Sequence, residues 1–329
     1  MISENEKTPM PTLREELGKV LVDLGREYKN LVVITGDLGK STGVSAFETF
    51  PERYFNLGIS EQDMVGTAAG LASTGKIPVI STYATFLAGR AWEQIRNSVA
   101  RDALNVKMIA THSGISPSAD GSSHQCFEDI TIIRSIPGIT LVLPADLTEM
   151  RQTVRAAVQT AGPFYIRLGR GDALTIFDDN DGFQVGKARK ISEGGDVGIV
   201  ATGPLVSEAI EAEALLRSEG IRASVIDMHT IKPADEEAII QLAEKTGAIV
   251  TVEDHNILGG LGGTITEIVC KHTPIPVEMI GIHDRFGESG DLRELMELHG
   301  LTARHITVAA KRAIERKDKL GIKEEKGLH

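Results

Sequence analysis

Short apolar runs alternate with helical segments along the whole chain. Leu13, Leu17, Val20, Leu21 and Leu24 recur at helical spacing after a capping-box pattern, TLRE, that begins at Thr12. A β-rich run then ends in Gly-Asp, and the alternation repeats. In the first half, the runs expected to form strands are 31–37, 77–82, 106–112, 139–146 and 164–170, and the later helices are expected at 60–73, 88–101 and 147–160. This alternation indicates a parallel sheet with both faces covered.

The pattern stops at the polar segment 171–190, which is typical of a linker, and then starts again. In the second half, strands are expected at 196–203, 222–228, 248–254 and 277–282, and helices near 204–219, 234–245, 262–272 and 302–316. The sequence therefore predicts an α/β protein of two domains with mostly parallel sheets, over residues 1–175 and 190–320.

Composition narrows the class of protein. The chain has 329 residues with a net charge of −11, which disfavours non-specific binding to nucleic acid. No apolar run approaches the roughly 18 residues that span a membrane. The two cysteines are too few for a disulfide framework, so we expect a cytoplasmic protein.

Polar residues that follow the strands are the first candidates for a site, because ligands of parallel sheets bind at the carboxyl ends of the strands. Glu61 is notable among them, since it begins a helix of mostly small apolar residues. An acid in the first turn of a helix is stabilised by the helix dipole by about 0.3–1 kcal/mol, which is a structural explanation. A carboxyl group in an apolar pocket is also suited to acid chemistry.

The segment THSGISPSADGSSHQCFED (111–129) is the most unusual stretch. Such a long polar loop is usually disordered or functional. No HxxxH or Cys-His cluster accompanies its two histidines, so we expect no metal there, and catalysis or anion binding is favoured. Cys126 is interpreted as a small buried residue. The Gly-rich segment 252–263 does not complete a GxGxxG fingerprint, and tight strand–helix packing explains it.

In order, these stretches resemble the C-terminal two-thirds of transketolase. The resemblance rests on GDLGKST (36–42), NLGISEQDMVGTAAGLA (56–72), THSG and ADGSSHQ within 111–125, IDMHTIKPAD (226–235) and VEDHNILGGLGG (252–263). The chain is similar to the separate C-terminal subunit of a split transketolase. The family implies a pyrimidine-binding domain followed by a transketolase C-terminal domain, acting with thiamine diphosphate.

The resemblance also assigns residues to the cofactor. Glu61 matches the acid that hydrogen-bonds the aminopyrimidine ring and so promotes loss of the thiazolium proton. Phe86 matches an aromatic side chain that packs on the pyrimidine, and Trp92 falls near a further family aromatic. Asp37 and Leu38, after the first strand, belong to the same expected cofactor site.

Other positions match the family's substrate contacts. His124 and Asp120 match residues that handle the substrate hydroxyls and their protons, and His124 is expected to be catalytic. The hydrogen-bond donors expected to bind a sugar phosphate are Arg14, Ser41, His112 and Arg167, with Arg170 as a neighbour.

The GDG motif that holds the diphosphate and magnesium in this family is absent from the sequence. The resemblance therefore implies a partner, an N-terminal transketolase subunit that carries Mg²⁺, in a heterotetramer. The expected reaction transfers a two-carbon ketol unit between sugar phosphates, as in pentose phosphate metabolism. Alternatives are a 1-deoxyxylulose-5-phosphate synthase-like enzyme, the beta subunit of a 2-oxo acid dehydrogenase, and a regulatory or scaffold chain that keeps the fold.

Overall fold

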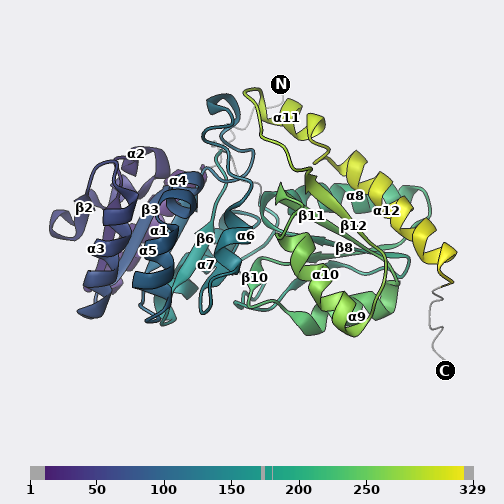
Figure 1. Ribbon diagram of the computed structural model, residues 1–329, viewed down its shortest axis with the longest axis horizontal. Coiled ribbons are helices and arrows are strands. Elements are labelled where there is room, and N and C mark those ends of the chain that lie inside the picture. The colour runs from purple at the N-terminus through teal and green to yellow at the C-terminus, as the bar shows by residue number, and fades with distance from the viewer. Residues whose placement is uncertain (1–11, 172–174, 180, 322–329) are drawn as a thin grey trace, which may run out of the picture.

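The protein is described by a computed structural model that covers residues 12–171, 175–179 and 181–321. It forms two α/β domains side by side, the first coloured purple to teal and the second green to yellow in Figure 1. Among the described residues, no helix is long and apolar enough to cross a membrane.

The first domain is built on a seven-stranded sheet with the order β10-β5-β6-β4-β3-β1-β2. Its strands are β1 (Leu31–Thr35), β2 (Tyr54–Asn56), β3 (Ile77–Tyr83), β4 (Lys107–Thr111), β5 (Thr140–Val142), β6 (Phe164–Arg167) and β10 (Thr230–Lys232). All pairs are parallel except β10 with β5. The predicted parallel sheet is therefore confirmed, and its strands begin and end within a few residues of the apolar runs.

Helices cover both faces of this sheet. Those of the first domain are α1 (Leu13–Glu27), α2 (Gly39–Thr42), α3 (Glu61–Ser73), α4 (Ala84–Arg90), α5 (Trp92–Gln94), α6 (Asp129–Arg134) and α7 (Leu147–Gln159), with a π-helical segment at Ile95–Ala100 and 3₁₀ segments at Val44–Thr49, Pro51–Arg53 and Ser118–Asp120. The helices α1 and α7 share one apolar core with the sheet, while α3, α4 and α6 pack in another. Thr12 and Glu15 form the predicted capping box, which fixes the start of α1.

The second domain has a five-stranded sheet with the order β12-β11-β8-β9-β7. Its strands are β7 (Arg189–Ser192), β8 (Val197–Ala201), β9 (Ala223–Asp227), β11 (Ile249–Asn256) and β12 (Val277–Ile282), and its helices are α8 (Val206–Ser218), α9 (Glu236–Thr246), α10 (Leu261–His272), α11 (Leu292–Leu298) and α12 (Ala303–Lys319), with a 3₁₀ turn at Gly203–Leu205. Only β7 is antiparallel to its neighbour.

The domains are joined by more than the linker. Strand β10 lies in the predicted second domain but hydrogen-bonds to β5 at the edge of the first sheet. One apolar core contains Ile130 and Ile133 of α6 together with Ile239, Ile265 and Val269 of the second domain. Because such an interface is apolar and continuous, we expect the domains to move as one body.

Candidate active site

The buried acid that was predicted at the start of α3 lies in an open hollow of the first domain. Glu61 is only 3% exposed, and apolar side chains of the same helix, including Met64 and Ala68, are buried beneath it. Ser60 precedes it but gives no side-chain cap, because its hydroxyl donates to the Leu57 carbonyl at 2.8 Å. Ser60 and Asp63 therefore form no capping box, although their spacing resembles one.

Arg90, which was not predicted, neutralises this acid. Its Nη1 donates to both carboxylate oxygens of Glu61 at 3.1 Å, and its guanidinium lies 4.2 Å from the centre of the Phe86 ring. A buried carboxylate is costly unless it is paired, so this contact explains how Glu61 is tolerated. Phe86 and Arg90 are four residues apart in α4, which places them on one helix face, and this spacing was the available signal.

The hollow has a volume of about 260 Å³ and brings together most of the predicted cofactor residues. Its lining is Gly36, Asp37, Leu38, Ile59, Glu61, Phe86, Arg90 and His124. Trp92 is not among them. Its indole N–H donates to the Ile132 carbonyl at 3.1 Å, and its ring packs against the core, so the structure gives Trp92 a packing role.

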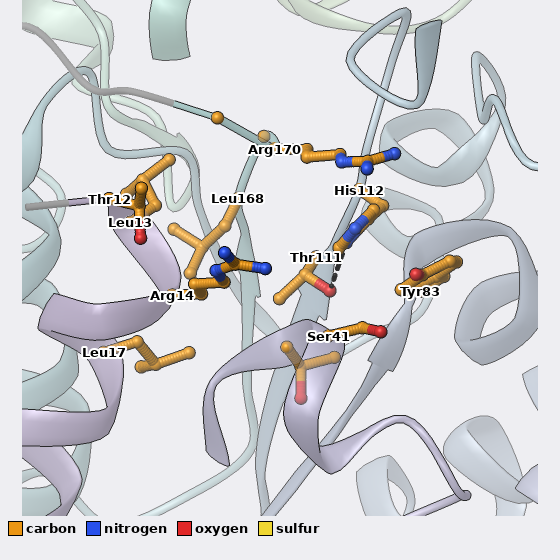
Figure 2. Close-up of a pocket in the computed structure, with 13 residues that line it drawn as sticks. Thr12, Leu13, Arg14, Leu17, Ser41, Tyr83, Thr111, His112, Leu168 and Arg170 are labelled. Carbon is orange, nitrogen blue, oxygen red and sulfur yellow. Dashed lines mark hydrogen bonds between the residues drawn. The ribbon is translucent and has the colours of Figure 1, made fainter. Parts of the chain in front are cut away.

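A second cavity, of about 220 Å³, opens at the carboxyl edge of the sheet. Figure 2 shows Arg14, Ser41, His112 and Arg170 around it. Arg14 comes from α1, Ser41 from α2, His112 from the end of β4, and Arg170 from the segment after β6. Three of the four expected donors, Arg14, Ser41 and His112, thus lie around one cavity, and their roles stay predictions.

The positive charge of this cavity comes from its two arginines. Burial, with a smaller effect of the nearby cations Arg170 and Arg14 and against the opposing effect of Asp120, lowers the pKa of His112 to about 4. His112 is therefore neutral at pH 7, and its Nδ1 lies 3.1 Å from the Thr111 hydroxyl. A neutral imidazole beside two guanidinium groups is suited to hydrogen-bonding an anion without needing to be charged.

Arg167 does not belong to this cavity, and its predicted place in the substrate grip is corrected by the structure. Its side chain is buried, with Nε donating to both oxygens of Asp129 at 2.9 and 3.0 Å. Its Nη2 donates to the carbonyls of Cys126 and Asp254. Tyr165, two residues earlier on β6, also donates to Asp129. Because side chains alternate between the two faces of a strand, Tyr165 and Arg167 point to the same face.

Arg170 takes the place that was expected for Arg167. It lies three residues further on, lines the cavity, and its Nη1 donates to Asp120 at 2.8 Å. Its backbone N–H donates to the Ser116 hydroxyl, which fixes the segment after β6 against the long polar loop. Asp120 is thereby held at the rim of the cavity.

An aromatic wall separates the two cavities. Tyr83 stacks on Phe86 with ring centres 5.8 Å apart, and on its other side on His112 at 3.8 Å. His124 meets the edge of Phe86 at 5.5 Å, and its Nδ1 lies 3.0 Å from the Ser123 hydroxyl. The acid hollow, the imidazole of His124 and the cationic cavity are therefore neighbours. Among the described residues there is no cluster of His, Cys, Asp or Glu that could hold a metal ion.

Comparison with known proteins agrees with this geometry. The family model described as transketolase, pyrimidine binding domain matches residues 10–174, and the one described as transketolase, C-terminal domain matches residues 186–306. The fold is thus that of a transketolase pyrimidine-binding domain followed by a transketolase C-terminal domain. The chain belongs to the transketolase family.

Individual relatives are similar over almost the whole chain. A protein of Methanocaldococcus jannaschii named as a transketolase C-terminal section is 44% identical to this chain. The match covers 92% of this chain and 95% of the length of that protein. The 6-deoxy-6-sulfo-D-fructose transketolase subunit SqwH of a Clostridium species is 40% identical over 93% of this chain and 95% of that subunit. A solved structure of a split gene transketolase, described as an inactive beta4 tetramer, is 44% identical to this chain, with a TM-score of 0.87. The match covers 93% of this chain and 99% of the chain in that structure.

Proposed function

We propose that this chain is the C-terminal subunit of a two-chain transketolase that transfers a two-carbon ketol unit from a ketose phosphate to an aldose phosphate. The observation that carries the proposal is the pairing of two cavities across the wall of Tyr83 and Phe86. One holds a buried acid beside an aromatic face, and the other holds two arginines. A cofactor and the anionic end of a substrate would thus lie on opposite sides of His124.

The residues of the hollow fit the pyrimidine end of thiamine diphosphate. The carboxyl group of Glu61 would donate a hydrogen bond to a nitrogen of the ring, the face of Phe86 would pack on the ring, and Leu38 and Ile59 would exclude water. When bound, thiamine diphosphate supplies the carbanion chemistry by which carbon–carbon bonds are cleaved and formed. Arg90 now covers both Glu61 and Phe86, so we expect its guanidinium to turn outward, where it is already half exposed.

A partner chain is part of the proposal, because the sequence contains no GDG motif for the diphosphate and Mg²⁺. Ile59, which lines the hollow, is 75% exposed, and the proposed partner chain would cover it. The related beta4 tetramer, described as inactive, is consistent with a need for the other subunit. We propose a heterotetramer of two such pairs, located in the cytoplasm, where the free thiols of Cys126 and Cys270 remain reduced.

The cationic cavity would bind the far end of the sugar. Arg14 and Arg170 offer planar guanidinium groups that match the oxygens of a phosphate, and Ser41 and His112 add neutral donors. A sulfonate presents similar oxygens, and a relative is named for a sulfosugar. A 2-oxo acid would leave these donors without a partner, so the cavity favours a sugar phosphate over the substrates of a 2-oxo acid dehydrogenase. A scaffold chain would need neither cavity.

We expect Arg170→Ala to raise the KM for phosphorylated ketoses and aldoses by about tenfold or more, since a hydrogen bond to a charged group contributes about 1.5–3 kcal/mol. The KM for an unphosphorylated donor such as hydroxypyruvate should change much less. Steady-state kinetics of the complex with its partner measure both. Arg26→Ala, which removes an exposed arginine paired only with Asp23, is the control. An equal effect of Arg170→Ala on both kinds of substrate would contradict the phosphate grip.

A further inference from the structure

The loop that carries Asp120 and His124 is closed at its base. Gly114 and Cys126 exchange backbone hydrogen bonds at 3.0 and 3.2 Å, so residues 115–125 leave and return at one point. The loop belongs to the first domain, yet its base and its flank are both held by the second domain. This arrangement gives the second domain a way to position His124.

The base of the loop is held by Asp254 of β11. Both carboxylate oxygens of Asp254 accept the Ile115 backbone N–H, at 2.9 and 3.1 Å. Gly114, at a φ of +58°, leaves room for this carboxylate, because a Cβ there would lie 1.9 Å from Oδ2. The start of the loop is therefore fixed against the second sheet.

The flank of the loop is held through Gln125, the residue next to His124. The Gln125 side chain is 5% exposed, and its Nε2 donates to the backbone carbonyl of Glu288 at 3.0 Å. Glu288 lies in the segment 283–291 that precedes α11. Arg285 anchors that segment by donating to His299 Nδ1 at 3.1 Å and to the Leu298 carbonyl at 2.9 Å.

This contact requires a glycine at position 287. A Cβ on Gly287 would lie 1.8 Å from Gln125 Oε1, which is too close for two atoms that are not bonded to each other. The atom it meets is the end of the Gln125 side chain, so an added methyl group would push that side chain off the Glu288 carbonyl. There is a second close approach between the loop and this segment. If Gly121 carried a Cβ, that atom would lie 2.5 Å from the Ser289 hydroxyl.

We propose that the C-terminal domain positions His124 for the reaction through the contact of Gln125 with residues 287 and 288. The proposal rests on the function proposed above only for what His124 does, and not for how it is held. Gln125 and Gly287 are positioning residues, since neither lines the hollow. A hydrogen bond of this kind favours the loop position that makes it by about two- to twelvefold over a position that does not. A reacting group displaced by about 1 Å can lose rate by up to about a hundredfold.

The first test is hydrogen exchange of the full chain, measured by mass spectrometry without partner or cofactor. Gly287→Ala and Gln125→Leu should each speed exchange in residues 115–125 severalfold and leave the strands of both sheets unchanged. Gly290→Ala is the matched control. The three atoms nearest to a Cβ there all belong to the Leu295 side chain, the closest at 3.1 Å, so the loop should exchange as in the wild type. Unchanged exchange in both test variants, or an equal change in the control, would overturn the proposal.

The second test is kinetics of the complex with its partner. Gly287→Ala should lower kcat about tenfold or more, with a change in KM of less than about threefold, because the cations of the substrate cavity stay in place. The double variant Gln125→Ala/Gly287→Ala should be no worse than Gln125→Ala alone, since the clash partner is gone. Additive losses, or a loss confined to KM, would overturn the positioning role. If the wild-type complex shows no ketol transfer, the proposed function fails, and the exchange experiment still decides how the loop is held.

Discussion

Glu61→Gln is expected to lower the turnover of the complex by about 10²–10⁴-fold, the contribution typical of an acid–base group. The substitution keeps the shape of the side chain and its ability to bond to Arg90, but it removes the acid. Arg90 is half exposed and can be solvated, so the free energy of unfolding should change little. Steady-state kinetics and thermal unfolding of the same preparations measure the two effects.

Asp63→Asn separates this role from the helix dipole. Asp63 lies in the same first turn of α3 but is exposed. If Glu61 only stabilises the start of the helix, the two variants should behave alike, with small losses of stability. A loss of turnover below about tenfold for Glu61→Gln would count against its role in the reaction.

Arg167→Met is expected to destabilise the fold by about 3–5 kcal/mol, because it leaves the carboxylate of Asp129 buried without its countercharge. Asp129 is fully buried, and the same arginine also joins the carbonyls of Cys126 and Asp254 across the domain boundary. Chemical denaturation of the full chain gives the free energy of unfolding.

Adding Asp129→Asn to Arg167→Met should recover part of that loss, since no charge is then left buried. Arg155→Ala, which removes a surface arginine paired with Glu27, should cost less than about 1 kcal/mol. If Arg167→Met proved as stable as the wild type and instead raised the KM for phosphorylated sugars, our placement of Arg167 in the interior would be wrong.

Much of the fold was predictable because apolar periodicity is local. The runs at 31–37, 77–82 and 106–112 each match a strand within two residues at either end, and the helices expected at 60–73 and 147–160 formed within one residue of those bounds. Strand β10 was not expected. It has three residues, Thr230–Lys232, and exists because a neighbouring domain brings it to the edge of β5. Such pairing leaves no periodic signal in the sequence.

Part of the candidate site was predictable from the residue types and from which polar residues follow the ends of the strands. Glu61, Asp37, Leu38 and Phe86, which the resemblance assigned to the cofactor, line one hollow together with His124, and their roles stay predictions. Arg167 and Arg170 were distinguished only by the structure, because the first lies inside a buried strand and the second follows its end. Arg90 was missed as a site residue for a similar reason: its partner, Glu61, is distant in the sequence.

The central claim is that this chain completes a transketolase only together with a second chain. The full chain is mixed with its N-terminal-type subunit, copurified from the native host, and with thiamine diphosphate, Mg²⁺ and a five-carbon ketose phosphate and aldose phosphate. Mass spectrometry should find seven-carbon and three-carbon sugar phosphates in the complete mixture, and neither product when either chain is omitted. Turnover by this chain alone would contradict the account. So would a complete mixture that forms no seven-carbon product from the ketose phosphate but, when pyruvate replaces the ketose phosphate, condenses it with the aldose phosphate.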